Sequence, residues 1–142
     1  MKASARNQFT GTVKDVIVGA VNAEVHVSLK GGETIAATVT KEAVDELDIK
    51  SGMEVIAMVK APQVIVITDF GGYKLSARNQ LTGTVTDVKQ GAVNSEIDIE
   101  LKGGEKIAAT ITNDSVTTLG LAKGQTATVA FKAGAVLLAV AK

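Results

Sequence analysis

The chain has 142 residues, of which 46% are hydrophobic and 21% charged, so it has enough apolar material for a folded core and disorder is not expected. The 15 basic and 15 acidic residues balance, and only 3% of the residues are aromatic, so neither a global field for nucleic acid or membranes nor base-stacking platforms are expected. With no Cys and one His, the chain has no disulfide framework, thiol nucleophile or Cys/His metal cluster.

The N-terminal segment begins Met1-Lys2-Ala3 and lacks the apolar region of a signal peptide. No other stretch approaches the roughly 18 apolar residues of a membrane span. These features predict a soluble, cytoplasmic protein that does not bind membranes.

Alternation of apolar and polar residues predicts two strands, over residues 10–18 and 24–29. The sequence Lys30-Gly31-Gly32-Glu33 predicts a tight hairpin, in which the glycines would supply positive φ angles. A third strand is expected over residues 34–40.

A short helix is expected over residues 41–47, with Thr40 as its N-cap and its apolar residues on one side. A fourth strand follows over residues 53–60, and after a bend at Pro62 a fifth strand covers residues 64–68. Five strands with one helix between the third and the fourth is the order of the oligonucleotide/oligosaccharide-binding (OB) barrel.

The whole element pattern occurs twice. The block Ser4-Ala5-Arg6-Asn7-Gln8 returns as residues 76–80, an offset of 72 residues (76 minus 4) that holds without a gap along each half. Three further blocks repeat at this offset: residues 19–22 and 91–94, 29–33 and 101–105, and 60–61 and 132–133.

We therefore predict an all-β protein of two tandem OB-fold-like five-stranded barrels, each with one short helix. Their expected bounds are residues 1–69 and 76–142, with a linker over 70–75. Because a domain of about 65 residues buries a marginal core, the copies are expected to pack together and the chain to self-associate.

Basic residues are retained at strand ends where their neighbours have diverged. Residues 53–59 share nothing with residues 125–131, yet both segments continue as Lys-Ala. One interpretation is that an Arg and a Lys converge on an anion together with hydroxyl and backbone N–H donors; the other is that they are solvated basic residues. The residues concerned are Ser4, Arg6 and Lys60 in the first copy and Ser76, Arg78 and Lys132 in the second.

Two further repeated features could present donors to an anion. Thr40 and Thr112 open the helices, where N–H groups and the helix dipole favour negative charge, although helix capping alone explains them. The second helix adds Ser115 where the first has Ala43. The repeated Gly-Ala-Val-Asn loop, which begins at Gly19 in the first copy, could form an anion nest or an ordinary turn.

No catalytic arrangement is found, so an enzyme is not expected and no cofactor is predicted. His26 is replaced by Asp98 in the second copy, which rules out a repeated Ser-His-Asp set. Glu24 and Glu96 are repeated, but the alternation places them on a strand surface without the features of a catalytic pair. Neither a phosphate-binding loop nor a dinucleotide fingerprint occurs.

The ordered blocks Ser-Ala-Arg-Asn-Gln, Thr-Gly-Thr-Val, Gly-Ala-Val-Asn and Lys-Ala resemble the Mop domain of the molbindins, and the whole chain resembles a two-Mop-domain member. The resemblance implies cytoplasmic binding of molybdate, or of the similar tungstate, for intracellular molybdenum storage and homeostasis. It also implies a homotrimer with sites at domain and subunit interfaces. Because no helix-turn-helix or ATPase motif is present, a free-standing member is expected.

The resemblance further implies two classes of oxyanion site, with no direct protein ligand to the metal. The first class would use Ser4, Arg6, Thr40, Lys60, Ala61, Ser76, Arg78, Thr112, Ser115, Lys132 and Ala133, with the helix-start residues supplied by a neighbouring domain. The second class would use Val21, Asn22, Val93 and Asn94 near the threefold axis. Ala43 against Ser115 and Pro62 against Gly134 break the symmetry of the copies.

Two other functions remain open. A domain of this type could sense the anion and act as a regulatory module through a protein partner. It could also be a single-stranded nucleic-acid-binding OB module, although the missing aromatics and the balanced charge argue against nucleic acid as a partner.

Overall fold

A computed structural model of the protein describes residues 1–142 and shows the predicted element order twice. The first copy contains β1 (Asn7–Val18), β2 (Asn22–Ser28), β3 (Thr34–Thr40), α1 (Lys41–Leu47), β4 (Glu54–Val59), the 3-10 helix η1 (Ala61–Gln63) and β5 (Ile65–Ile67). The second copy contains β6 (Asn79–Gln90), β7 (Asn94–Leu101), β8 (Lys106–Thr112), α2 (Asn113–Leu119), β9 (Thr126–Phe131), η2 (Ala133–Ala135) and β10 (Leu137–Ala139). The predicted order of three strands, a helix and two strands is therefore confirmed for each copy.

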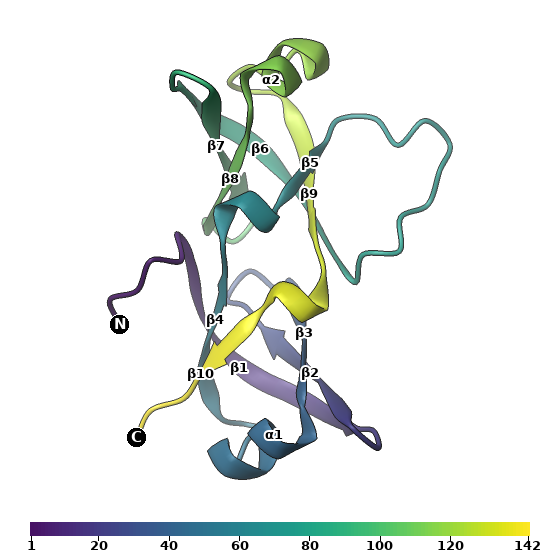
Figure 1. Ribbon diagram of the computed structural model, residues 1–142, viewed down its shortest axis with the longest axis vertical. Helices are drawn as coiled ribbons and strands as arrows, with labels where there is room; N and C mark the ends of the chain where they lie inside the picture. Colours follow the sequence, from purple (N-terminus) through teal and green to yellow (C-terminus); the bar gives the residue numbers. More distant parts are fainter.

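The strands form two five-stranded antiparallel sheets that exchange their last strands. One sheet has the order β10-β4-β1-β2-β3, and the other has the order β5-β9-β6-β7-β8. Each sheet thus takes four strands from one copy and its fifth from the other copy. Figure 1 shows the two sheets stacked along the long axis, with β5 beside β9 in the upper half and β10 beside β4 in the lower half.

Each sheet curls into the predicted OB-like form. Its longest strand carries a β-bulge, between Val13 and Asp15 in β1 and between Val85 and Asp87 in β6. A bulge bends a strand and increases its twist, which favours this curvature. The edge strands β10 and β3 of one sheet contact each other, as do β5 and β8 of the other. The prediction of two OB-like five-stranded units with one short helix each is confirmed.

The chain crosses from one sheet to the other directly after β4 and β9. Lys60 and Lys132 have extended backbones and precede the 3-10 helices η1 and η2. The helix η1 packs against β8 of the second copy, and η2 packs against β3 of the first. The repeated Lys-Ala pairs therefore mark the crossover points of the fold.

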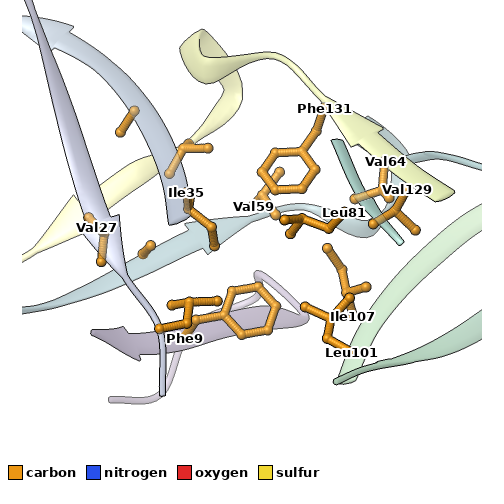
Figure 2. Close-up of a cluster of buried hydrophobic side chains, with 14 of the residues drawn as sticks. Phe9, Val27, Ile35, Val59, Val64, Leu81, Leu101, Ile107, Val129 and Phe131 are labelled. Atoms are coloured by element: carbon orange, nitrogen blue, oxygen red, sulfur yellow. The ribbon is translucent and has the colours of Figure 1, made fainter. Parts of the chain in front are cut away.

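One hydrophobic core runs through both halves. The cluster has 27 buried residues drawn from both copies and is built mainly of Val, Ile, Leu and Ala, as the composition predicts. Phe9 and Phe131 are 5% and 1% exposed, and Figure 2 shows them in one group with Val59 and Leu81. The crossing segments contribute Val64 and Val66 from the first copy and Val136 from the second to this cluster, so the two halves share one continuous core.

The helix caps match the prediction. The Thr40 hydroxyl accepts a hydrogen bond from the Ala43 N–H at 3.0 Å, and the Thr112 hydroxyl accepts one from the Ser115 N–H at 3.1 Å. Neither α-helix has the length and apolar character that a membrane crossing requires.

The hairpin glycines differ in part from the prediction. Only the second glycine of each pair has a positive φ, 90° at Gly32 and 86° at Gly104. Gly31 and Gly103 are instead required by packing, since a Cβ on Gly31 would lie 2.5 Å from the Gly103 Cα. The expectation that both glycines serve turn geometry was wrong, because the two hairpins meet at this point.

Candidate functional site

One cavity lies between the two copies and gathers basic and hydroxyl side chains. It has a volume of about 530 Å³ and is lined by Ser76, Arg78, Lys132 and Ala133 of the second copy. The opposite wall comes from β3, η1 and β5 of the first copy. The crossover after β9 brings Lys132 to the start of β6, so two repeated blocks far apart in sequence meet at this cavity.

The lysines at the crossovers have no acidic partner. Lys132 and Lys60 are both exposed, and neither forms an ion pair with a carboxylate. The alanines that follow them, Ala61 and Ala133, are 2% and 5% exposed, so burial at the crossover explains their identity. Burial does not explain why lysine is retained before them.

A second cavity of about 430 Å³ contains the first-copy counterparts Ser4 and Lys60. Arg6 and Ala61 do not line it, whereas Gly134 and Leu137 of the second copy do. The two copies therefore present related but unequal cavities.

The helix-start residues lie apart from these basic side chains. Thr40 lines a third cavity of about 300 Å³, together with second-copy residues of η2 and β10. Thr112 and Ser115 share a hydrogen bond of 2.8 Å between their hydroxyls at the start of α2. Within one chain, the start of neither α-helix lines the cavity that contains Arg78 and Lys132.

The Val-Asn loops lie at opposite ends of the molecule, each beside its own helix. The carbonyl of Val21 accepts from the Lys41 N–H at 2.8 Å, and that of Val93 accepts from the Asn113 N–H at 2.9 Å. Because α1 and α2 lie at the two ends of the long axis, no single region of one chain contains both loops (Figure 1). Asn22 and Asn94 are exposed, and so are both valines.

The two arginines of the repeated blocks each meet a glutamate of the other copy. Arg78 Nη2 lies 2.5 Å from Glu24 Oε2. Arg6 makes two contacts with Glu96, 2.7 Å from Nη1 to Oε1 and 3.0 Å from Nη2 to Oε2. Neither pair was predicted from the sequence. Retention of the glutamates at the same offset as the arginines was the available sign, but their pairing depends on how the copies pack.

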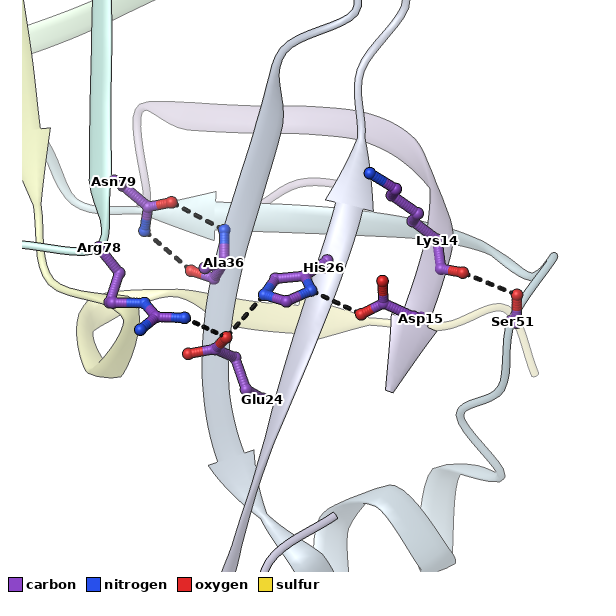
Figure 3. Close-up of polar contacts among 8 residues, drawn as sticks. All are labelled: Lys14, Asp15, Glu24, His26, Ala36, Ser51, Arg78 and Asn79. Carbon is purple, nitrogen blue, oxygen red and sulfur yellow. Dashed lines mark hydrogen bonds and ion pairs between the residues drawn. The ribbon is translucent and has the colours of Figure 1, made fainter. Parts of the chain in front are cut away.

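The glutamates have second partners, and these differ between the copies. Glu24 Oε2 lies 2.6 Å from His26 Nε2, and Figure 3 shows His26 between Glu24 and Asp15. In the second copy, Lys89 Nζ lies 3.4 Å from Glu96. Hydrogen bonds and charge attraction from Asp98, and then from Glu96, raise the pKa of Lys89 above its ordinary 10.5.

A buried asparagine pair was also missed. Asn79 is 1% exposed, and its side chain donates to the Ala36 carbonyl at 2.8 Å and accepts from the Ala36 N–H at 2.7 Å (Figure 3). Asn7 makes the same two bonds to Ala108, at 2.8 and 2.7 Å. Both asparagines occupy inward-facing strand positions where apolar residues are the norm, which was the sign in the sequence.

The cavity that contains Ser76, Arg78 and Lys132 suits an anion that only accepts hydrogen bonds. It offers guanidinium, ammonium and hydroxyl donors, and no carboxylate lines it. The structure contains no group of three or more His, Cys, Asp or Glu side chains arranged to hold a metal ion.

Comparison with known proteins finds the same repeat. A model of the TOBE domain matches residues 3–66 and again residues 75–138. The molybdenum transport protein ModE of Herbaspirillum seropedicae is 46% identical over 140 residues, which are 99% of this chain and 52% of that protein. The molybdenum-pterin-binding protein MopA of Rhodobacter capsulatus is 41% identical over 140 residues, 99% of this chain and 53% of that protein. The chain thus spans about half the length of these curated relatives.

Among solved structures, the chain is similar to the cytoplasmic molybdate-binding protein ModG in a crystal form with molybdate bound. The TM-score is 0.96 at 50% identity, and the alignment covers 99% of this chain and 100% of that one.

Proposed function

Because the chain belongs to the molbindin family, with two TOBE domains of the Mop type in tandem, we propose that it binds molybdate in the cytoplasm and holds it for molybdenum storage, without transforming it. The observation that carries this proposal is the convergence of Ser76, Arg78 and Lys132 on one cavity that no carboxylate lines. The alignment over the full length of a molybdate-binding protein supports the choice of anion.

The chemistry of molybdate matches these donors. Molybdate is a tetrahedral dianion at neutral pH, so it accepts hydrogen bonds and donates none. Charge-assisted hydrogen bonds contribute about 1.5 to 3 kcal/mol each, so a few of them give micromolar or tighter binding. Tungstate presents the same charge and shape and is expected to bind as well. Two related anions are expected to bind less well. Sulfate is smaller than molybdate, and protonated phosphate carries a hydrogen that would find no acceptor.

Self-association is part of the proposal. Val21 and Val93 are each 72% exposed at equivalent positions, and Ile65 and Leu137 are 55% and 64% exposed on the exchanged strands. Because the same apolar positions are exposed in both repeats, we expect them to be buried against other molecules of the same protein. A homotrimer would bring several Val-Asn loops together as a second class of site, and would supply Thr40, Thr112 and Ser115 to the first class from a neighbouring subunit.

Calorimetric titration of the anion-stripped protein with molybdate tests the proposal, with sulfate and phosphate as competing anions and the assembly mass measured alongside. Lys132→Ala is expected to weaken one class of site by about 10-fold to 100-fold, the loss of one charge-assisted hydrogen bond. Lys123→Ala, a change of an exposed lysine outside the cavities, serves as the control. No molybdate binding by the unmodified protein would refute the proposal.

A second candidate function is an anion-sensing module that acts through a protein partner. Its support is the name of a relative, the transcriptional regulator ModE of Yersinia pestis, which is 34% identical over 140 residues. A pull-down whose captured partner changes with molybdate would support sensing, whereas a partner-free protein that binds several anions per chain would support storage.

A further inference from the structure

The two arginines that the proposed function assigns to oxyanion binding are already engaged by carboxylates. In each pair the guanidinium is exposed, with Arg78 61% and Arg6 60% accessible, while the partners Glu24 and Glu96 are 21% and 16% accessible. The glutamate is therefore the fixed member of each pair, and the arginine lies on the solvent side.

Each glutamate is also held from its own copy. Glu24 contacts His26 at 2.6 Å, and His26 in turn contacts Asp15 at 2.5 Å (Figure 3). Glu96 lies within 3.4 Å of the Lys89 ammonium. These contacts do not involve the arginines, so the carboxylates would keep their places if the arginines turned toward another anion.

From this geometry we infer that Glu24 and Glu96 are affinity-setting residues, whose carboxylates compete with the oxyanion for Arg78 and Arg6. The inference rests on the proposed function. A guanidinium carries five N–H donors, so it can contact a carboxylate and an oxyanion together, but the two negative charges then lie only a guanidinium apart and repel. The carboxylate thereby lowers the affinity of the site for the dianion and holds the arginine while the site is empty.

Each glutamate belongs to the opposite copy from the arginine that it contacts. Glu24 belongs to the first copy but acts on the cavity that contains Ser76, Arg78 and Lys132 of the second. Glu96 acts in the opposite direction, on Arg6. Because Glu24 is shared with His26 and Glu96 with Lys89, the two sites have unlike competitors and are expected to differ in affinity.

The test compares Glu24→Gln and Glu96→Gln with the unmodified protein in calorimetric titrations with molybdate. Glutamine keeps the size of the side chain and one acceptor for the arginine but removes the charge. We expect Glu24→Gln to tighten by about tenfold the class of site that Arg78→Ala abolishes, the magnitude for a single negative charge about 5 Å from a dianion at a dielectric close to that of water, as suits an arginine that is 61% exposed. Glu96→Gln should do the same for the sites that depend on Arg6, and it repeats the test if the first variant fails to fold.

The controls separate competition from a structural role. Glu100→Gln removes an exposed, unpaired carboxylate from the same strand as Glu96 and should change affinity less than twofold. The double variant Glu24→Gln/Arg78→Ala should bind no more tightly than Arg78→Ala alone.

Unchanged or weaker binding in both glutamine variants would overturn the inference, because the carboxylates would then orient or merely anchor the arginines. Absence of molybdate binding by the unmodified protein would instead refute the proposed function before the variants are compared.

Discussion

Replacement of Asn79 by Ala should destabilise the protein by about 3 kcal/mol. The side chain is 1% exposed and makes both of its hydrogen bonds to the backbone of Ala36, which is itself 7% exposed. The truncation leaves one buried N–H and one buried carbonyl without partners, and each such group costs about 1 to 3 kcal/mol. The total is large beside a typical domain stability of about 5 to 15 kcal/mol.

Equilibrium denaturation in urea measures this change. Far-UV circular dichroism is the suitable probe, because the chain has no Trp and its single tyrosine, Tyr73, is 82% exposed. Asn7→Ala removes the equivalent bonds to Ala108 and should cost a similar amount. Gln90→Ala, at an exposed amide outside the proposed sites, should stay within about 0.5 kcal/mol of the unmodified protein. A cost below about 1 kcal/mol for Asn79→Ala would refute the reasoning, since the Ala36 groups would then have found other partners.

Gly31→Ala should lower the free energy of unfolding by about 1 to 3 kcal/mol in the same denaturation experiment, because its Cβ would lie 2.5 Å from Gly103. The control is Gly134→Ala, whose Cβ meets no atom within 4 Å. Equal stabilities of the two variants would contradict the packing argument. Lys89 has a raised pKa, so its contribution to stability should be complete at pH values below 10.5 and should disappear as the pH rises through the higher folded value. A stability difference between the unmodified protein and Lys89→Met that persists at high pH would speak against this. Phe131→Ala should lower stability by about 3 to 5 kcal/mol, and calorimetry should still record one unfolding transition because the core is shared; two separate transitions would show that the halves unfold independently.

Much of the local structure could be predicted because it depends on neighbouring residues. Period-two alternation identified the strands, and the helix over residues 41–47 has the predicted bounds and the predicted cap at Thr40. The offset of the repeated blocks carried these assignments to the second copy, where Thr112 caps α2.

The candidate site could be predicted only in part. The sequence singled out Ser76, Arg78 and Lys132 by comparison of the copies, and the structure brings them to one cavity. It gave no means to see that Arg78 contacts Glu24, which lies 54 residues away in the sequence and in the other copy. Their use in anion binding remains a prediction.

The sequence by itself determined the repeat, the order and bounds of most elements, and the donor types retained in both copies, because these follow from side-chain pattern and from chain-local hydrogen bonding. Only the tertiary structure decided that β5 joins β9 and β10 joins β4. A short apolar strand can complete either sheet equally well by its own pattern, so the choice depends on the crossover at η1 and η2 and on the contacts that the two copies make once they meet. The arginine pairs, the buried asparagines and the meeting of Gly31 with Gly103 all follow from that choice.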